Sequence, residues 1–107
     1  MNSYVVNRYN KPTQGATSQL LTFPSDNSAG ILQFASHQKT TKVIFLSVTG
    51  AGIFMTVDGN NPAVNNNHKL YAGNNYYFNA DLIRVAKFKI DNNATSTGYI
   101  YASELTN

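Results

Sequence analysis

The 107-residue sequence contains no cysteine and no tryptophan, and it contains few charged residues. Without cysteine the chain can form neither a disulfide nor a thiolate metal site, so packing and backbone hydrogen bonds must hold the fold. Charged residues make up 12% of the chain, about half of the usual share. Asparagine, threonine and serine supply the polarity instead. Such a surface can be buried against another protein with little charge to desolvate, although the codon usage of an AT-rich genome explains the same composition.

Clustered basic residues and long apolar runs are also missing. The net charge is +3 with the lysines and arginines scattered, whereas a nucleic-acid-binding surface usually shows a basic stripe. No run reaches the roughly 18 apolar residues of a membrane span, and residues 1–10 lack the apolar core of a signal peptide. We therefore expect no nucleic-acid partner, no membrane partner, and a protein made in the cytoplasm or carried in a larger particle.

The most apolar stretch covers residues 42–58, KVIFLSVTGAGIFMTVD. Its first half holds four consecutive large apolar residues, Val43 to Leu46, which indicates burial on both faces, or on one face with a partner on the other. Glycines at positions 50 and 52 interrupt the stretch, and an alternating run follows at residues 53–57. Two strands around a glycine turn predict a β-hairpin here.

Turn-forming residues divide the rest of the chain into short segments. Further strands are expected at residues 15–23, 31–34, 76–78, 82–90 and 99–102, with a polar hairpin loop at 91–98 and a tail from Glu104. No segment has a convincing helical period. Seven or eight short strands predict an all-β fold, a small antiparallel β-sandwich or jelly-roll-like barrel, and the length predicts one domain over residues 1–107. Consecutive strands are expected to be antiparallel neighbours.

Residues 1–12 stand apart from this pattern. They contain Tyr4, Val5 and Tyr9 and end at Pro12, which cannot donate to a strand ladder. The segment is either a short edge strand, an arm that docks on a neighbouring molecule, or a frayed terminus.

The acidic and histidine side chains lie where catalysis is not expected. The carboxylates fall at predicted turns or in the tail, and both histidines fall in polar loops; they are Asp26, Asp58, Asp81, Asp91, Glu104, His37 and His68. A turn aspartate most often bonds to its own backbone, so we expect no catalytic, cofactor-binding or metal-binding residues and no enzyme. A deep polar cleft that gathers Asp58, His68 and Asp81 would contradict this expectation.

Tyrosines are the remaining candidates for a functional surface. Five of them lie in the C-terminal half of the chain: Tyr71, Tyr76, Tyr77, Tyr99 and Tyr101. Tyr99 and Tyr101 are two positions apart, so they share one face of a strand. On a solvent-facing side they would form a rigid patch suited to a protein interface or to sugar stacking; the alternative is a core position with the hydroxyl reaching the surface.

Several segments from Lys42 onward resemble a known group of proteins. They are the strand and turn of residues 57–62, the segment HKLYAG at 68–73, the pair at 83–84 and the closing strand GYIY at 98–101. Together they resemble the small β-sandwich virion structural proteins of tailed bacteriophages, a group that includes capsid decoration (cement) proteins. The resemblance implies a non-enzymatic role in the virion, assembled in the host cytoplasm.

On this basis we expect a decoration protein that binds the major capsid protein, stabilises the shell, and self-associates, with a trimer favoured. The candidate interface residues are Tyr4, Val5, Tyr9, Phe45, Tyr76, Tyr77, Tyr99 and Tyr101. A carbohydrate-binding module using Tyr76 and Tyr77 with Asn74 and Asn75 is one alternative. A head-to-tail or tail-fibre component of the virion is the other.

Overall fold

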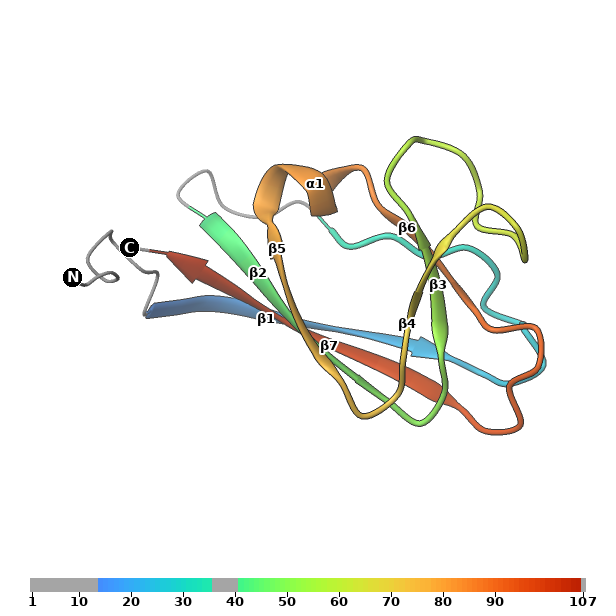
Figure 1. The fold of residues 1–107 in the computed structure, drawn as a ribbon. Helices are drawn as coiled ribbons and strands as arrows, with labels where there is room; N and C mark the ends of the chain where they lie inside the picture. Colours follow the sequence, from blue (N-terminus) through green and yellow to red (C-terminus); the bar gives the residue numbers. More distant parts are fainter. Residues whose placement is uncertain (1–13, 36–40, 107) are drawn as a thin grey trace.

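The computed structural model describes residues 14–35 and 41–106, and it consists of two antiparallel β-sheets that face each other (Figure 1). The strands are β1 (Gln14–Phe23), β2 (Thr41–Thr49), β3 (Ile53–Thr56), β4 (His68–Leu70), β5 (Asn75–Asn79), β6 (Lys87–Ile90) and β7 (Gly98–Thr106), with one short helix, α1 (Ala80–Arg84). The expected all-β class is confirmed. No helix within the described ranges is long and apolar enough to cross a membrane.

The strand order identifies the type of sandwich. The larger sheet has the order β1-β7-β2-β5, and the smaller sheet has the order β4-β3-β6. Leu32 extends the smaller sheet beyond β6 by a single antiparallel bridge, because its backbone exchanges two 2.9 Å hydrogen bonds with that of Phe88. If Leu32 is counted as the second of eight strands along the chain, β2 to β7 become strands 3 to 8. The two sheets then have the orders 1-8-3-6 and 2-7-4-5, which is the strand order of a jelly roll. The jelly-roll-like expectation is therefore confirmed, although residues 31–34 contribute only this bridge.

The expected hairpin over residues 42–58 is wrong. Strand β2 pairs with β5 and β7, whereas β3 pairs with β4 and β6. Residues 50–52 carry the chain from one sheet to the other. Ile44 and Leu46 on β2, and Ile53 on β3, are all buried in the shared core. Two strands that each have an apolar face bury those faces by packing across the sandwich, and pairing side by side would not achieve this.

Two further sequence expectations change for related reasons. The loop at residues 91–97 is not a hairpin loop, because it joins β6 in the smaller sheet to β7 in the larger sheet. The expected strand at 82–90 begins only at Lys87, since residues 80–84 form α1. Asn79 caps this helix, and its Oδ1 accepts a hydrogen bond from the backbone N of Asp81 at 2.9 Å. The alternating residues 87–90 do form strand β6, and only the preceding residues are helical.

The core lies between the sheets and is built from alternate residues of the strands. The fully buried large side chains are Phe23, Leu46, Val48, Ile53, Phe88, Ile90 and Ile100. Burying each such side chain contributes about 1.5–3 kcal/mol. Glu104 does not lie in a tail as expected: it belongs to β7, is 3% exposed, and accepts a 2.8 Å hydrogen bond from Thr41 Oγ1. A buried carboxylate requires such polar contacts.

Phe54 is buried although it points away from that core. It lies in β3 with Lys69 of β4 and Lys89 of β6 directly opposite on either side. Phe54 is 6% exposed. The apolar stems of long basic side chains cover neighbouring apolar surface while their charged ends remain in water. The outer face of the smaller sheet is therefore basic at its surface, which distinguishes it from the outer face of the larger sheet.

An ion pair ties β4 to the loop at residues 91–97 and predicts an acid-sensitive part of the stability. Lys69 Nζ lies 2.7 Å from Asp91 Oδ2, and this hydrogen bond lowers the pKa of the Asp91 carboxyl. A carboxyl whose pKa is lower in the folded state stabilises the fold above its unfolded pKa of about 3.9. That contribution disappears as the pH falls through the folded value.

We therefore expect Asp91→Asn to reduce the loss of melting temperature between pH 7 and pH 3, as measured by circular dichroism. The effect is small because the Lys69 side chain is 37% exposed, and ion pairs that water reaches contribute little. Lys69→Met should reduce the loss to the same extent, and the double variant should show no further change. An additive effect of the two substitutions would show that the pair does not act as a unit.

Candidate functional site

The outer face of the larger sheet is the most distinctive surface of the molecule. Alternation buries one side of each strand and turns the other side outward. The outward-pointing residues, which we call the outer face, are Leu20, Thr22, Val43, Phe45, Ser47, Thr49, Asn75, Tyr77, Asn79, Tyr99, Tyr101, Ser103 and Leu105. None of these side chains is charged. Seven of them are aromatic or aliphatic, and they lie on four adjacent strands.

Aromatic rings form the centre of the outer face. Phe45 on β2 lies directly opposite Tyr77 on β5, and their ring centroids are 4.8 Å apart. Tyr99 and Tyr101 stack along β7 with centroids 6.3 Å apart and an angle of 25° between the rings. Tyr77 is 68% exposed and Tyr101 is 50% exposed. Contiguous exposed apolar side chains of this kind mark interaction surfaces, whereas single ones do not.

The structure thus brings four of the eight candidate interface residues onto one surface: Phe45, Tyr77, Tyr99 and Tyr101. Sequence reasoning missed Leu20, which is 50% exposed and lies opposite Tyr101. The signal for it was the pair Leu20-Leu21, because adjacent residues of a strand point to opposite faces and one of the two must leave the core.

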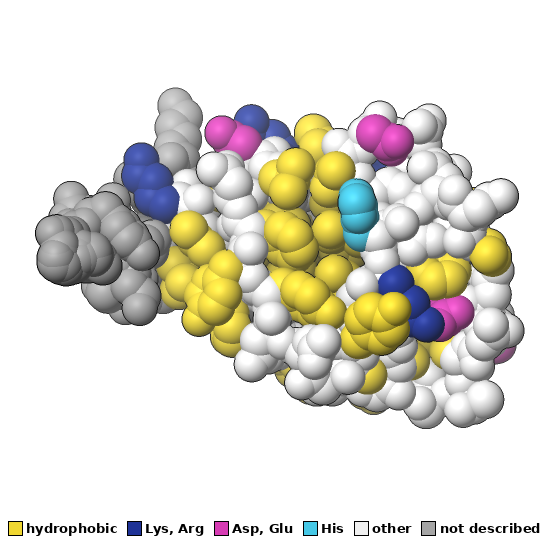
Figure 2. Space-filling model, viewed as in Figure 1, with side chains coloured by type: hydrophobic (Ala, Val, Ile, Leu, Met, Phe, Trp, Pro, Cys, Tyr) yellow, Lys and Arg dark blue, Asp and Glu magenta, His cyan; other side chains and the backbone are white. Residues whose placement is uncertain are grey.

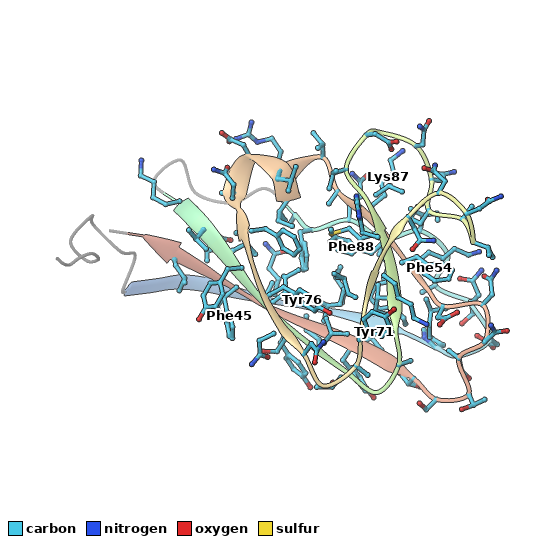
Figure 3. The ribbon with its side chains drawn as sticks, in the orientation of Figure 1. Phe45, Phe54, Tyr71, Tyr76, Lys87 and Phe88 are labelled. Atoms are coloured by element: carbon cyan, nitrogen blue, oxygen red, sulfur yellow. The ribbon has the colours of Figure 1, made fainter. Side chains whose placement is uncertain are left out.

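Tyr76 does not belong to the outer face. It precedes Tyr77 in β5, so it points to the other side, and Figure 3 shows Phe45 and Tyr76 on opposite sides of that strand. Its hydroxyl accepts a 2.8 Å hydrogen bond from the backbone N of Tyr71, and its ring stacks 6.1 Å from that of Phe78. Tyr76 and Tyr77 therefore do not form the shared sugar platform that a carbohydrate-binding module was expected to use.

The other three candidates, Tyr4, Val5 and Tyr9, lie outside the described residues. The same holds for His37.

Asp26 and Asp58 bond to the backbone of their own turns, as expected, whereas Asp81 lies in α1 and pairs with Arg84. Asp26 Oδ1 accepts a hydrogen bond from the backbone N of Ser28 at 2.9 Å, and Asp58 Oδ1 accepts one from the backbone N of Asn60 at 3.0 Å. Hydrogen bonds from Ser28 lower the pKa of Asp26, and hydrogen bonds from Asn60 lower the pKa of Asp58. Both carboxylates are therefore charged at neutral pH and are engaged in their own turns.

Two hollows adjoin each other on the side of the sandwich where β4 and β5 lie. An apolar hollow of about 400 Å³ opens there; its lining is Met55, Val57, His68, Lys69, Leu70, Tyr76, Phe78 and Leu82. Figure 2 shows hydrophobic side chains gathered on this side of the molecule, and His68 belongs to the lining. A polar hollow of about 310 Å³ shares Val57 and His68 with it and also holds Asp58 and residues 65–67.

The polar hollow does not bring Asp58, His68 and Asp81 together. Asp58 and His68 line it, but Asp81 lies in α1 and lines a separate hollow with Thr41 and Lys42. Within the described part of the chain, no three His, Cys, Asp or Glu side chains are grouped so that they could hold a metal ion.

Comparison with known proteins adds no family to this description. No family model matches the chain, and neither the curated proteins nor the solved structures contain a match.

Proposed function

We propose that the protein is a structural protein of a tailed-phage virion, a decoration protein that docks on the major capsid protein through its outer face. The observation that carries the proposal is the uncharged, aromatic outer face, with Phe45 against Tyr77 and Tyr99 against Tyr101. Jelly rolls are used repeatedly in viral capsids. The resemblance of residues 42–101 to small virion proteins agrees with that use.

The chemistry of the outer face fits a protein partner. Tyrosine and phenylalanine are enriched at the centre of protein interfaces, while charged residues are depleted there. Rigid rings lose little side-chain entropy on binding, and the tyrosine hydroxyls retain hydrogen-bonding capacity. Serine, threonine and asparagine between the rings add short polar groups that are cheap to desolvate compared with charges.

Many weak contacts would give the binding its strength. A shell presents symmetric sites in many copies, so a symmetric homo-oligomer of this chain, with a trimer favoured, would bind several sites at once. Light scattering of the purified protein should then show a homo-oligomer. A strictly monomeric protein that does not bind shells would refute the proposed function.

A charge placed in the centre of the outer face should weaken docking strongly without unfolding the protein. We expect Tyr101→Asp and Tyr77→Asp each to weaken binding to shells assembled without the protein by at least about tenfold, which corresponds to about 1.4 kcal/mol. Both positions are at least half exposed, so the melting temperature should change little. Cosedimentation with empty shells measures the binding.

Tyr71→Asp is the matched control. Tyr71 is 56% exposed, like the other two tyrosines, but it lies between β4 and β5, outside the outer face. It should retain shell binding. Equal losses at positions 71, 77 and 101 would show that the outer face has no special role.

A glycan ligand is the second candidate, and one observation favours it. The near-parallel rings of Tyr99 and Tyr101 form an exposed aromatic surface on β7, on which a sugar ring could stack. A glycan array that gives hits with the natural protein and none with Tyr101→Ala would support this function. An array without hits would remove it.

A further inference from the structure

Strand β5 is an unprotected edge of the larger sheet. Proteins protect strand edges with charged side chains, bulges, short strands or a covering segment. Within the described residues, the edge strand β1 has a register shift between Gly15 and Ser18, and β6 is bridged by Leu32. Strand β4 has three residues and contains Lys69. Strand β5 pairs with β2 without a shift, and its sequence NYYFN holds no charge and no proline (Figure 1). Such an edge is a template for another strand.

The backbone groups on this edge follow from the pairing of β5 with β2. The backbone N of Val48 donates a 3.1 Å hydrogen bond to the backbone O of Asn74, which directly precedes β5. Hydrogen-bonded positions alternate along an antiparallel pair, so Tyr76 and Phe78 also turn their backbone groups toward β2. The alternate residues of β5 turn their N–H groups toward the free edge, and these residues are Asn75, Tyr77 and Asn79.

We propose that the partner of this edge is β5 of a second copy of the chain, paired antiparallel about a two-fold axis at Tyr77. The sequence NYYFN has nearly the same chemistry in both directions. In this register Asn75 lies opposite Asn79 of the second copy, and Tyr76 lies opposite Phe78 of the second copy. Tyr77 faces its own equivalent, and the two residues exchange a pair of backbone hydrogen bonds. Each ring therefore meets a ring, and cross-strand aromatic pairs stabilise a sheet.

Charge also favours the pairing of β5 with itself. A two-fold axis places residues near their own equivalents, so a charged edge brings like charges together at a cost in binding free energy. Neither β5 nor the outer face, on which Tyr77 lies, has a charged side chain. Pairing of β4 with its own copy would instead bring two copies of Lys69 together.

The pairing extends both surfaces of the larger sheet. On one side, the outer faces of the two copies join across a continuous sheet of eight strands, four from each copy. On the other side, Tyr76 and Phe78 line the apolar hollow and are only partly buried, and the second copy covers them further. Tyr77 is 68% exposed in the single chain, so it has the largest surface to lose in the dimer.

The size of the contact sets the expected affinity. A fully covered aromatic side chain buries about 150–250 Å². Each copy contributes the three rings of β5, and each ring is covered only in part. The buried area therefore falls below the roughly 1,200 Å² of a stable complex. We expect a reversible dimer with a dissociation constant of roughly 10–100 μM.

Analytical ultracentrifugation of the natural protein, over concentrations that span this constant, tests the dimer. Tyr77→Lys opposes two like charges at the two-fold axis, so it should weaken the dimer at least about fivefold. Tyr101→Lys is the matched control, because Tyr101 is an exposed tyrosine of the same outer face. Five strand spacings, about 24 Å, separate Tyr101 from its equivalent, and salt screens charges over that distance. This variant should keep the dimerisation constant of the natural protein.

Three results would overturn the proposal: a monomer at every concentration, a trimer, or equal weakening by the two lysine substitutions. Circular dichroism establishes that both variants are folded. The dimer does not depend on the proposed function. A monomeric protein that binds shells would overturn the dimer and leave the decoration role standing.

A disulfide provides a second measurement, because the natural chain has no cysteine to interfere. Residues that face each other in a hydrogen-bonded pair have Cα atoms about 5.5 Å apart, which a disulfide can span. The constant for the intermolecular disulfide of Tyr77→Cys in a glutathione buffer should exceed that of Tyr101→Cys by at least about tenfold, since the dimer holds the two thiols together. Mass spectrometry of the intact protein measures both. Equal constants would overturn the proposal.

Discussion

Phe88→Ala should destabilise the protein by about 3–5 kcal/mol, which is the usual cost of removing a fully buried phenylalanine side chain. Phe88 is 0% exposed and lies in β6, where it pairs with Leu32 on one side and with Met55 of β3 on the other. Its ring meets that of Phe34 edge-on at 5.2 Å. Truncation leaves a cavity that both sheets line. Because domains of this size are stable by only about 5–15 kcal/mol, the urea midpoint should fall by roughly 2 M.

Phe45→Ala is the matched control for this prediction. Phe45 is also a strand phenylalanine with an aromatic neighbour, Tyr77, but it lies on the outer face and is only partly buried. Its removal leaves no enclosed cavity, so we expect a loss of about 1 kcal/mol or less. Similar losses for the two variants would mean that the core does not lie between the two sheets at Phe88.

The sequence was sufficient to predict most of the strands, but it missed β4 and placed a strand over residues that form α1. The alternation of residues 87–90 indicates inward and outward positions correctly, because this period is a local property of the chain. For residues 99–102 it indicates only that Tyr99 and Tyr101 share a face, and the structure shows that this face is the outer one. The candidate face followed from the same rule, which places Tyr99 and Tyr101 together. Tyr76 and Tyr77 show how the rule must be applied: adjacent residues in a strand never share a face.

The choice of sheet for each strand could not be predicted in the same way. Residues 42–58 contain two apolar strands around a glycine turn, and this local pattern is the same for a hairpin and for a crossing between sheets. The pairing partners decide between them, and they are distant in sequence: β2 pairs with β7, and β3 pairs with β6. The hydrogen bonds of β2 to two other strands leave no free edge for β3.

The crossing at residues 50–52 leads to the second large prediction, that Gly50→Ala disrupts the junction of the two sheets. Gly50 has φ +82°, and an added Cβ would lie 2.1 Å from the backbone O of Thr97. The backbone O of Gly50 also accepts a 2.5 Å hydrogen bond from Ser96 Oγ. The crossing from β2 to β3 thus packs directly on the crossing from β6 to β7. A Cβ at position 50 must push these backbones apart, and this adds to the roughly 1–2 kcal/mol that left-handed backbone costs an ordinary residue.

Gly73→Ala separates the two contributions. Gly73 lies in the crossing from β4 to β5 and has φ +89°, but an added Cβ would meet no atom within 4 Å. It should therefore cost only the backbone term of about 1–2 kcal/mol, whereas Gly50→Ala should cost at least about 2 kcal/mol more, measured as the difference in free energy of unfolding in urea. If both variants lose the same stability, the two crossings do not pack against each other at Thr97. The larger loss at position 50 would instead show that the sheets are joined by two loops in contact, an arrangement that a hairpin over residues 42–58 cannot produce.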